Sequence, residues 1–223
     1  RNSLKKISFI EQLILIFLVY TLVSALISIP FYLSNYQVTL LNSFFESVSG
    51  LTGTGFSIFE NIKYLDPTLI IWRSSSQWIG GLYFLIFLII IFSNKQFNFK
   101  MNDLTFSGDG SISSENNIKS LILKIFILYS TLSFVIFILL NLSEVRMFNS
   151  LNLSMSLISN SGFLPTNTLK KIIETNFQKI IFIFSLLISM LNFFLILNIF
   201  KKKILIREHK EDLYLIILAV IFI

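Results

Sequence analysis

The chain has 223 residues, of which 54% are hydrophobic and only 13% are charged, and its formal net charge is +6. This apolar content exceeds that of ordinary soluble domains and indicates a membrane protein. Cysteine is absent and His209 is the single histidine, which excludes disulfides, thiolate metal sites and most histidine-based catalysis.

Four apolar segments are long enough to cross a bilayer, which takes about 20 residues. They cover residues 10–31, 69–92, 120–142 and 179–200, and a fifth begins near residue 213. The first follows three basic residues but is too long for a signal peptide and has no small-residue cleavage site. We therefore expect a retained membrane helix that ends at Pro30.

The basic residues predict the orientation of these segments. Twelve of the 18 Lys and Arg residues lie before the first segment, between the second and third, or after the fourth, and the other six lie on the opposite side. By the positive-inside rule, we expect a cytoplasmic N-terminus in a multi-pass protein of the plasma membrane, the inner membrane in a bacterium. The bilayer is then its partner. Nucleic acid is not expected, because the lysines cluster at the ends of apolar runs rather than on one amphipathic face.

Two shorter segments lie in the predicted outer connections, 40–51 (LLNSFFESVSGL) and 147–158 (MFNSLNLSMSLI). Neither can span a membrane, but each has the length of a helix that enters and stops halfway. A glycine-containing stretch follows each of them. Because non-helical backbone survives at membrane depth only where protein buries it or water lines it, we predict two re-entrant pore helices with pore loops.

The two segments repeat each other at an offset of 107 residues. Identical pairs are Asn42 and Asn149, Ser43 and Ser150, Ser47 and Ser154, Ser49 and Ser156, Gly55 and Gly162, and Phe56 and Phe163. Both copies lie between an incoming and an outgoing span of the same orientation, so the repeat is parallel, with its axis along the membrane normal. The fold class we predict is an all-α integral membrane protein with repeated helix, re-entrant pore loop and helix units around a central pore.

The composition of the loops is typical of a potassium filter. A dehydrated ion needs several oxygen ligands, which backbone carbonyls of symmetric loops supply. Glycine permits adjacent carbonyls to point the same way, and the C-terminal end of a half-helix favours a cation. We expect ion-binding carbonyls at Thr52, Gly53, Thr54, Gly55, Ser159, Asn160, Ser161 and Gly162, with no transition metal.

Several stretches resemble the Trk/Ktr/HKT superfamily of potassium transporters. FESVSGLTGTGFS and WRSSSQWIGGL resemble its first repeat, RMFNSLNLSMSLISNSGFLPTN its second, and IREHKEDLYLIILA the entry to its third. The string WRSSSQWIGG is the most specific signal, and the resemblance covers essentially the whole chain. It implies the membrane subunit of a potassium uptake system that is built from four such repeats, of which this chain would be the N-terminal half.

The resemblance also implies how the chain is organised and what it contacts. Residues 1–100 would form the first repeat, 101–117 a cytoplasmic loop, 118–203 the second repeat and 204–223 the start of a third. A homodimer of full-length chains is expected, with a nucleotide-binding regulatory subunit of the RCK/KTN type on the cytoplasmic face. Potassium would be the transported ion, and no covalently bound cofactor is expected.

Residues outside the loops are expected to support them. Arg73 either snorkels to water or forms an ion pair with Glu46 or Asp66 that braces the pore helix. Trp78 is expected to anchor and pack, as is Trp72. The remaining supporting residues of the WRSSSQWIGG string are Gln77, Gly80 and Gly81, and the two glycines are expected to allow close helix approach.

Three alternatives to a potassium transporter remain at this stage. Gly53 interrupts the usual threonines of the family's first loop, and Ser161 stands where its second loop usually has glycine. Gly55 favours potassium, but a sodium-permeable or non-selective monovalent cation transporter stays open. A two-repeat channel that assembles as a dimer also stays open, although the TVGYG signature is absent. An intramembrane serine enzyme is disfavoured, because no base lies near Ser57 or the serines of RSSSQ.

Overall fold

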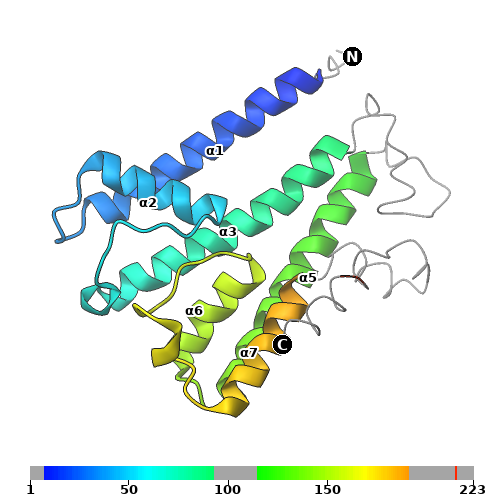
Figure 1. The fold of residues 1–223 in the computed structure, drawn as a ribbon. Coiled ribbons are helices and arrows are strands. Elements are labelled where there is room, and N and C mark those ends of the chain that lie inside the picture. Colours follow the sequence, from blue (N-terminus) through cyan, green and yellow to red (C-terminus); the bar gives the residue numbers. More distant parts are fainter. Residues whose placement is uncertain (1–7, 93–114, 191–213, 215–223) are drawn as a thin grey trace.

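The structure is a computed structural model that describes residues 8–92, 115–190 and 214. Within these residues every regular element is helical (Figure 1), which confirms the all-α prediction. The elements are α1 (Phe9–Tyr32), α2 (Leu40–Thr52), the 3₁₀ helix η1 (Ile62–Tyr64), α3 (Pro67–Phe92), α5 (Glu115–Leu142), α6 (Met147–Ile158), the 3₁₀ helix η2 (Leu169–Lys171) and α7 (Asn176–Met190).

Three of the described helices have the length and apolar composition of membrane spans. They cover Phe9–Tyr32, Pro67–Ile91 and Lys119–Leu142, close to the first three predicted segments. Helix α7 begins the predicted fourth span, and the rest of that span lies outside the described residues. The predicted start of a third repeat, 204–223, also lies outside them except for Tyr214.

Two helix ends differ from the sequence prediction. Helix α1 continues past Pro30 to Tyr32, and the Leu33 N–H still donates to the Ile29 carbonyl at 2.9 Å. Proline removes one helical hydrogen bond, but its fixed φ suits the helix and the last turn closes. Helix α5 begins at Glu115 and so takes up the last residues of the predicted loop 101–117, because a polar first turn suits a helix N-terminus. The remainder of that loop lies outside the described residues.

The two half-helices occupy matching places among the spans. Helix α2 contacts α1 and α3, whereas α6 contacts α3, α5 and α7. After each half-helix the chain turns and runs back toward the end from which that half-helix started (Figure 1). With 13 and 12 residues they measure roughly 20 Å, less than the hydrocarbon core of about 30 Å. Helix α3 contacts both half-helices, α2 and α6.

Apolar side chains are distributed as expected for a helix bundle in lipid. Along α1, large side chains such as Phe17, Leu22 and Leu26 are more than half exposed. A small cluster that includes Phe31 and Leu51 fills the space between α1, α2 and α3, and a larger one surrounds α5 and α6. Because lipid tails solvate apolar groups, the exposed face needs no protein partner.

Candidate pore-loop site

The internal repeat is present in the backbone as well as in the sequence. Helices α2 and α6 begin 107 residues apart, at Leu40 and Met147, and the 3₁₀ helices η1 and η2 are offset by the same interval. Positive φ values recur at this spacing, with Gln37 at 51° and Glu144 at 67° before the half-helices, and Gly53 at 72° and Asn160 at 50° after them. Two segments with such matched irregular geometry are equivalent structural units.

The first loop begins where α2 ends in a left-handed residue. Gly53 donates its N–H to the Gly50 carbonyl at 3.1 Å, and Gly55 follows with φ of 78°. The hydroxyl of Thr52 donates to the Val48 carbonyl at 2.8 Å, and that of Thr54 to the Ser49 carbonyl at 3.2 Å. Both threonine hydroxyls therefore bind the end of the half-helix and hold the loop against it.

The second loop reproduces these contacts with serines. The Ser159 hydroxyl donates to the Met155 carbonyl at 2.8 Å, and the Ser161 hydroxyl to the Ser156 carbonyl at 3.2 Å. Within the described residues, two contacts with α6 have no counterpart in the first loop: the Ser161 N–H donates to the Ser156 carbonyl at 3.0 Å, and the Ser156 hydroxyl donates to the Ser161 carbonyl at 3.0 Å. That carbonyl is already engaged with α6, whereas in the first loop the carbonyl of Phe56 accepts from the equivalent Ser49.

The two loops meet at the glycines that the repeat aligns. A Cβ added at Gly55 would lie 2.7 Å from the Gly162 Cα and 3.0 Å from its nitrogen. A Cβ added at Gly53 would lie 3.6 Å from the Ser161 Cβ. The two loops that contain the eight residues predicted from sequence thus lie against each other, and they approach most closely at Gly55 and Gly162.

Helix α3 supports both loops through its two adjacent glycines. A Cβ at Gly80 would overlap the Leu51 carbonyl in the last turn of α2, and one at Gly81 would lie 2.8 Å from the Ser159 Cβ. The Tyr20 hydroxyl of α1 donates to the same Leu51 carbonyl at 2.9 Å. Gly80 and Gly81 therefore allow the close helix approach that the sequence predicted, each toward a different loop.

A buried ion pair holds the C-terminal end of the first loop. Arg73 Nε donates to Glu46 Oε1 at 2.8 Å, with 1% and 0% of the two side chains exposed. Arg73 Nη2 donates to the Ser57 hydroxyl at 2.9 Å, and the Ile58 N–H donates to Glu46 Oε2 at 2.9 Å. Of the two roles considered for Arg73, the ion pair with Glu46 is the one observed. It joins α2, α3 and the chain that leaves the loop.

The two repeats also contact each other outside the glycines. The Arg73 guanidinium lies 4.1 Å from the ring centroid of Phe163, which is buried. Trp78 Nε1 donates to the Ser133 hydroxyl of α5 at 2.9 Å, and the Tyr129 hydroxyl donates to the Trp78 carbonyl at 3.0 Å. Trp78 thus joins α3 to α5 by packing and hydrogen bonding, while its predicted place at the membrane interface stays a prediction.

Some contributors to the site were missed by the sequence reasoning. The sequence predicts Tyr20 only as part of a span, and Asn160 only as the source of an ion-binding backbone carbonyl. The Asn160 side chain also ties the loop to α7, because Nδ2 donates to the Ser189 carbonyl at 3.2 Å and the Ser189 hydroxyl donates back to Asn160 Oδ1. A lone tyrosine or serine within an apolar span is the signal that indicates such contacts, since buried polar groups seek partners.

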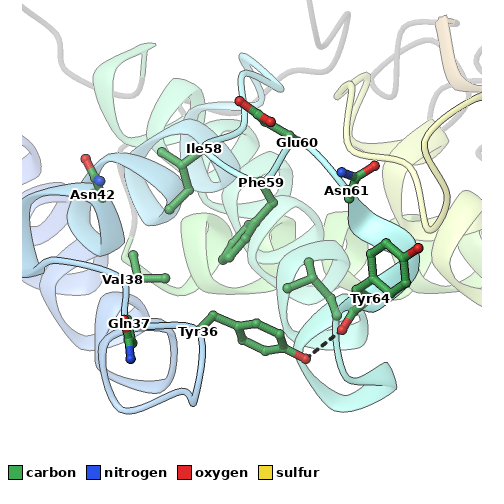
Figure 2. Close-up of a pocket in the computed structure, with 10 residues that line it drawn as sticks. Tyr36, Gln37, Val38, Asn42, Ile58, Phe59, Glu60, Asn61 and Tyr64 are labelled. Atoms are coloured by element: carbon green, nitrogen blue, oxygen red, sulfur yellow. Dashed lines mark hydrogen bonds between the residues drawn. The ribbon is translucent and has the colours of Figure 1, made fainter.

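A pocket of about 350 Å³ lies beside the residues that follow the first loop, Ile58 to Asn61. Figure 2 shows Tyr36 and Tyr64 on one side of it, where the Tyr36 hydroxyl donates to the Tyr64 carbonyl at 2.9 Å. Its lining includes Phe59 and Glu60 but none of the eight loop residues. Among the described residues no group of three His, Cys, Asp or Glu side chains is placed to hold a metal ion. The pore loops therefore remain the candidate site.

Comparison with known proteins relates the chain to cation transporters. It is 30% identical over 155 residues to an uncharacterized cation transporter, MJ1485, of Methanocaldococcus jannaschii, an alignment that covers 67% of this chain and 31% of that protein. It is 36% identical over 81 residues to the Trk system potassium uptake protein TrkI of Halomonas elongata, covering 36% and 16% of the two chains. No family model matches the chain.

The fold is similar to that of a solved potassium transporter. The crystal structure of TrkH from Vibrio parahaemolyticus superposes with a TM-score of 0.72 at 22% identity, over 87% of this chain and 39% of that one. The alignments span less than two fifths of the length of each of these relatives. These similarities in sequence and in fold confirm that the chain resembles a Trk-type membrane subunit, as the loop motifs indicated.

Proposed function

Because this chain is TrkH-like in sequence and in fold, we propose that it contributes two of the loops that line a potassium uptake pore. The observation that carries the proposal is the meeting of two equivalent loops at Gly55 and Gly162, each at the C-terminal end of a half-helix. The partial negative charge of those helix ends favours a cation between them. The relatives are named as transporters, in agreement with the prediction that the chain is not an enzyme.

The loop geometry supplies the ligands that such a pore needs. Within the described residues, the carbonyls of Gly53, Thr54 and Gly55 accept no hydrogen bond, while the threonine hydroxyls are taken up by α2. Carbonyls held in this way can replace the water around a potassium ion. Two loops line only part of a ring, and we propose that further repeats of the same kind supply the rest. A homodimer and a cytoplasmic nucleotide-binding subunit remain part of this proposal.

The first test concerns Gly55 in the complete protein. Serine at this position meets two obstacles, a φ of 78° that disfavours a side chain and a Cβ only 2.7 Å from the Gly162 Cα. We expect the loop carbonyls to turn away from the ion. The preference for potassium over sodium should then fall by about 1–3 kcal/mol, which is roughly 5- to 150-fold in discrimination. The measurement is rubidium uptake, with sodium as competitor, in cells that lack their own potassium importers.

Two further variants make this test specific. Gly162→Ser should be milder, because its Cβ would lie 3.4 Å from the Gly55 Cα and its φ is not in the left-handed region. Gly108→Ser, in the predicted cytoplasmic loop, should behave as wild type. Wild-type uptake and sodium rejection by Gly55→Ser, at equal expression, would remove Gly55 from the filter. A wild-type protein that prefers sodium would favour the alternative of a sodium-permeable transporter.

The orientation of the chain is tested separately by reporter fusions. The positive-inside distribution places the chain near residues 110 and 205 in the cytoplasm and the segments near 60 and 170 outside. Fusions at these four places should therefore report inside, inside, outside and outside. An outside signal near 110 would contradict the hairpin arrangement. Matched fusions without the first span provide the control for the reporter.

A further inference from the structure

Gln77 is a fully buried glutamine whose amide is unused within the described part of the chain. Its side chain is 0% exposed, and neither Oε1 nor Nε2 has a hydrogen-bond partner there. Buried polar groups are normally paired, since leaving them unpaired is unfavourable. A fully buried glutamine whose amide has no partner points to a ligand for that amide.

The position of Gln77 on α3 identifies the part of the site that it faces. Gln77 is four residues after Arg73 and four before Gly81, so the three share one face of the helix. Arg73 lies over the ring of Phe163, and a Cβ at Gly81 would meet Ser159. Phe163 and Ser159 are the two ends of the second loop, which places Gln77 behind the middle of that loop.

A second unused donor lies on the same face. Arg73 Nη1 is buried and has no hydrogen-bond partner in the described residues, although Nε and Nη2 are engaged. Gln77 and Arg73 together present donors and an acceptor one helical turn apart. A buried water needs two to four polar partners, and Gln77 Oε1, Gln77 Nε2 and Arg73 Nη1 are three groups on this face that are unpaired within the described residues.

The second unit of the repeat has no glutamine at the equivalent position. At the offset of 107 residues Gln77 aligns with Phe184, which is 52% exposed, so the helix, pore loop and helix unit does not need a glutamine here. The second loop is the one built with serines, whose Ser161 carbonyl is engaged with α6. The N–H groups of Asn160 and Ser161 also donate to α6, at the Leu157 and Ser156 carbonyls. Within the described residues this leaves the Gly162 N–H and the carbonyls of Asn160 and Gly162 as the groups that an external support would orient.

We propose that Gln77, acting with Arg73 Nη1 through buried water, holds the backbone of the second loop and thereby determines ion selectivity. Gln77 is a positioning residue in this account and does not touch the ion. The inference rests on the proposed pore function and adds to it a polar support behind the loop. It differs from a purely structural role, because it predicts a change in selectivity without a loss of stability.

The test replaces Gln77 with leucine and, separately, with methionine in the complete protein. Both substitutions keep a similar volume and remove the amide. Rubidium uptake with sodium as competitor should show a roughly 2- to 10-fold loss of discrimination, the value of one lost hydrogen bond. The Tm of the purified protein should stay close to that of the wild type, because the lost water-mediated hydrogen bond is offset by burying an apolar side chain of similar volume.

Gln178→Leu is the matched control. Gln178 is also a buried glutamine, but its Oε1 accepts from the N–H groups of Glu174 and Thr175, and its Nε2 donates to the Ser143 carbonyl. Its loss should lower Tm and leave discrimination unchanged.

Three results would overturn the inference. The first is wild-type discrimination in both Gln77 variants. The second is a loss of discrimination that occurs only in variants whose Tm is also lowered. The third is failure of both variants to accumulate in the membrane. If the wild-type protein moves no rubidium, the proposed function itself fails, and the inference falls with it.

Discussion

Replacing Gly80 by alanine should displace the first pore loop and abolish transport, although the change adds a single methyl group. The new Cβ would overlap the Leu51 carbonyl oxygen and lie 2.6 Å from its carbon. These are backbone atoms, so no side-chain rotation relieves the clash, and the last turn of α2 must move away from α3. The move also stretches the hydrogen bond from Tyr20 to the same carbonyl. Overpacking of this kind costs about 1–3 kcal/mol.

Rubidium uptake at equal membrane levels and the Tm of the purified protein would measure this effect. Gly50→Ala is a suitable control, since it adds the same methyl group to the same helix contact. Its Cβ would meet the Ser76 hydroxyl, the end of a side chain that can rotate, and lie 3.2 Å from Phe163 Cε2. We expect Gly50→Ala to be much milder. Normal uptake by Gly80→Ala would show that α3 does not set the position of the first loop.

The sequence predicted the half-helices well because several signals agreed there. The pattern of residues 40–51 and 147–158 recurs at one interval, and the helices begin at Leu40 and Met147 as expected. Hydroxyl groups near the C-terminal ends of these helices have two possible uses, as oxygen ligands of an ion or as partners of the helix backbone. In the structure they donate to carbonyls in the last turns of the half-helices, which is the more local of the two uses.

Contacts between the repeats were beyond the reach of the sequence pattern. Phe56 and Phe163 are aligned by the repeat, yet Phe56 is 71% exposed and Phe163 is 2% exposed. The difference arises because the Phe163 ring packs against the first repeat, beside the Arg73 guanidinium and Gly50. Nothing in a periodic pattern specifies which neighbour a loop residue meets, since that depends on how distant helices pack. For the same reason the partner of Arg73 stayed open until the structure placed Glu46 beside it.

The ion pair between Arg73 and Glu46 gives the second prediction, in which two destabilising changes compensate each other. Arg73→Ile leaves the Glu46 carboxylate buried without a counter-charge. Glu46→Leu likewise leaves the Arg73 guanidinium buried without a counter-charge. Breaking a buried pair from one side costs about 3–5 kcal/mol, whereas replacing both partners by apolar residues is often nearly neutral. The second repeat has the apolar residues Leu153 and Ile180 at the equivalent positions, of which Leu153 is buried and Ile180 is exposed. We expect the double variant to be more stable than either single variant.

The measurement is the Tm of the purified wild type, the two single variants and the double variant, with rubidium uptake recorded for each. Recovery of stability need not restore transport, because Glu46 also accepts the N–H of Ile58 and the hydroxyl of Ser57, which leave the first loop. We expect the double variant to fold and still reject sodium poorly, since that tether is lost. Additive losses of stability in the double variant would show that the two charges do not depend on each other. Full sodium rejection by a stable double variant would show that the loop is held without the Glu46 carboxylate.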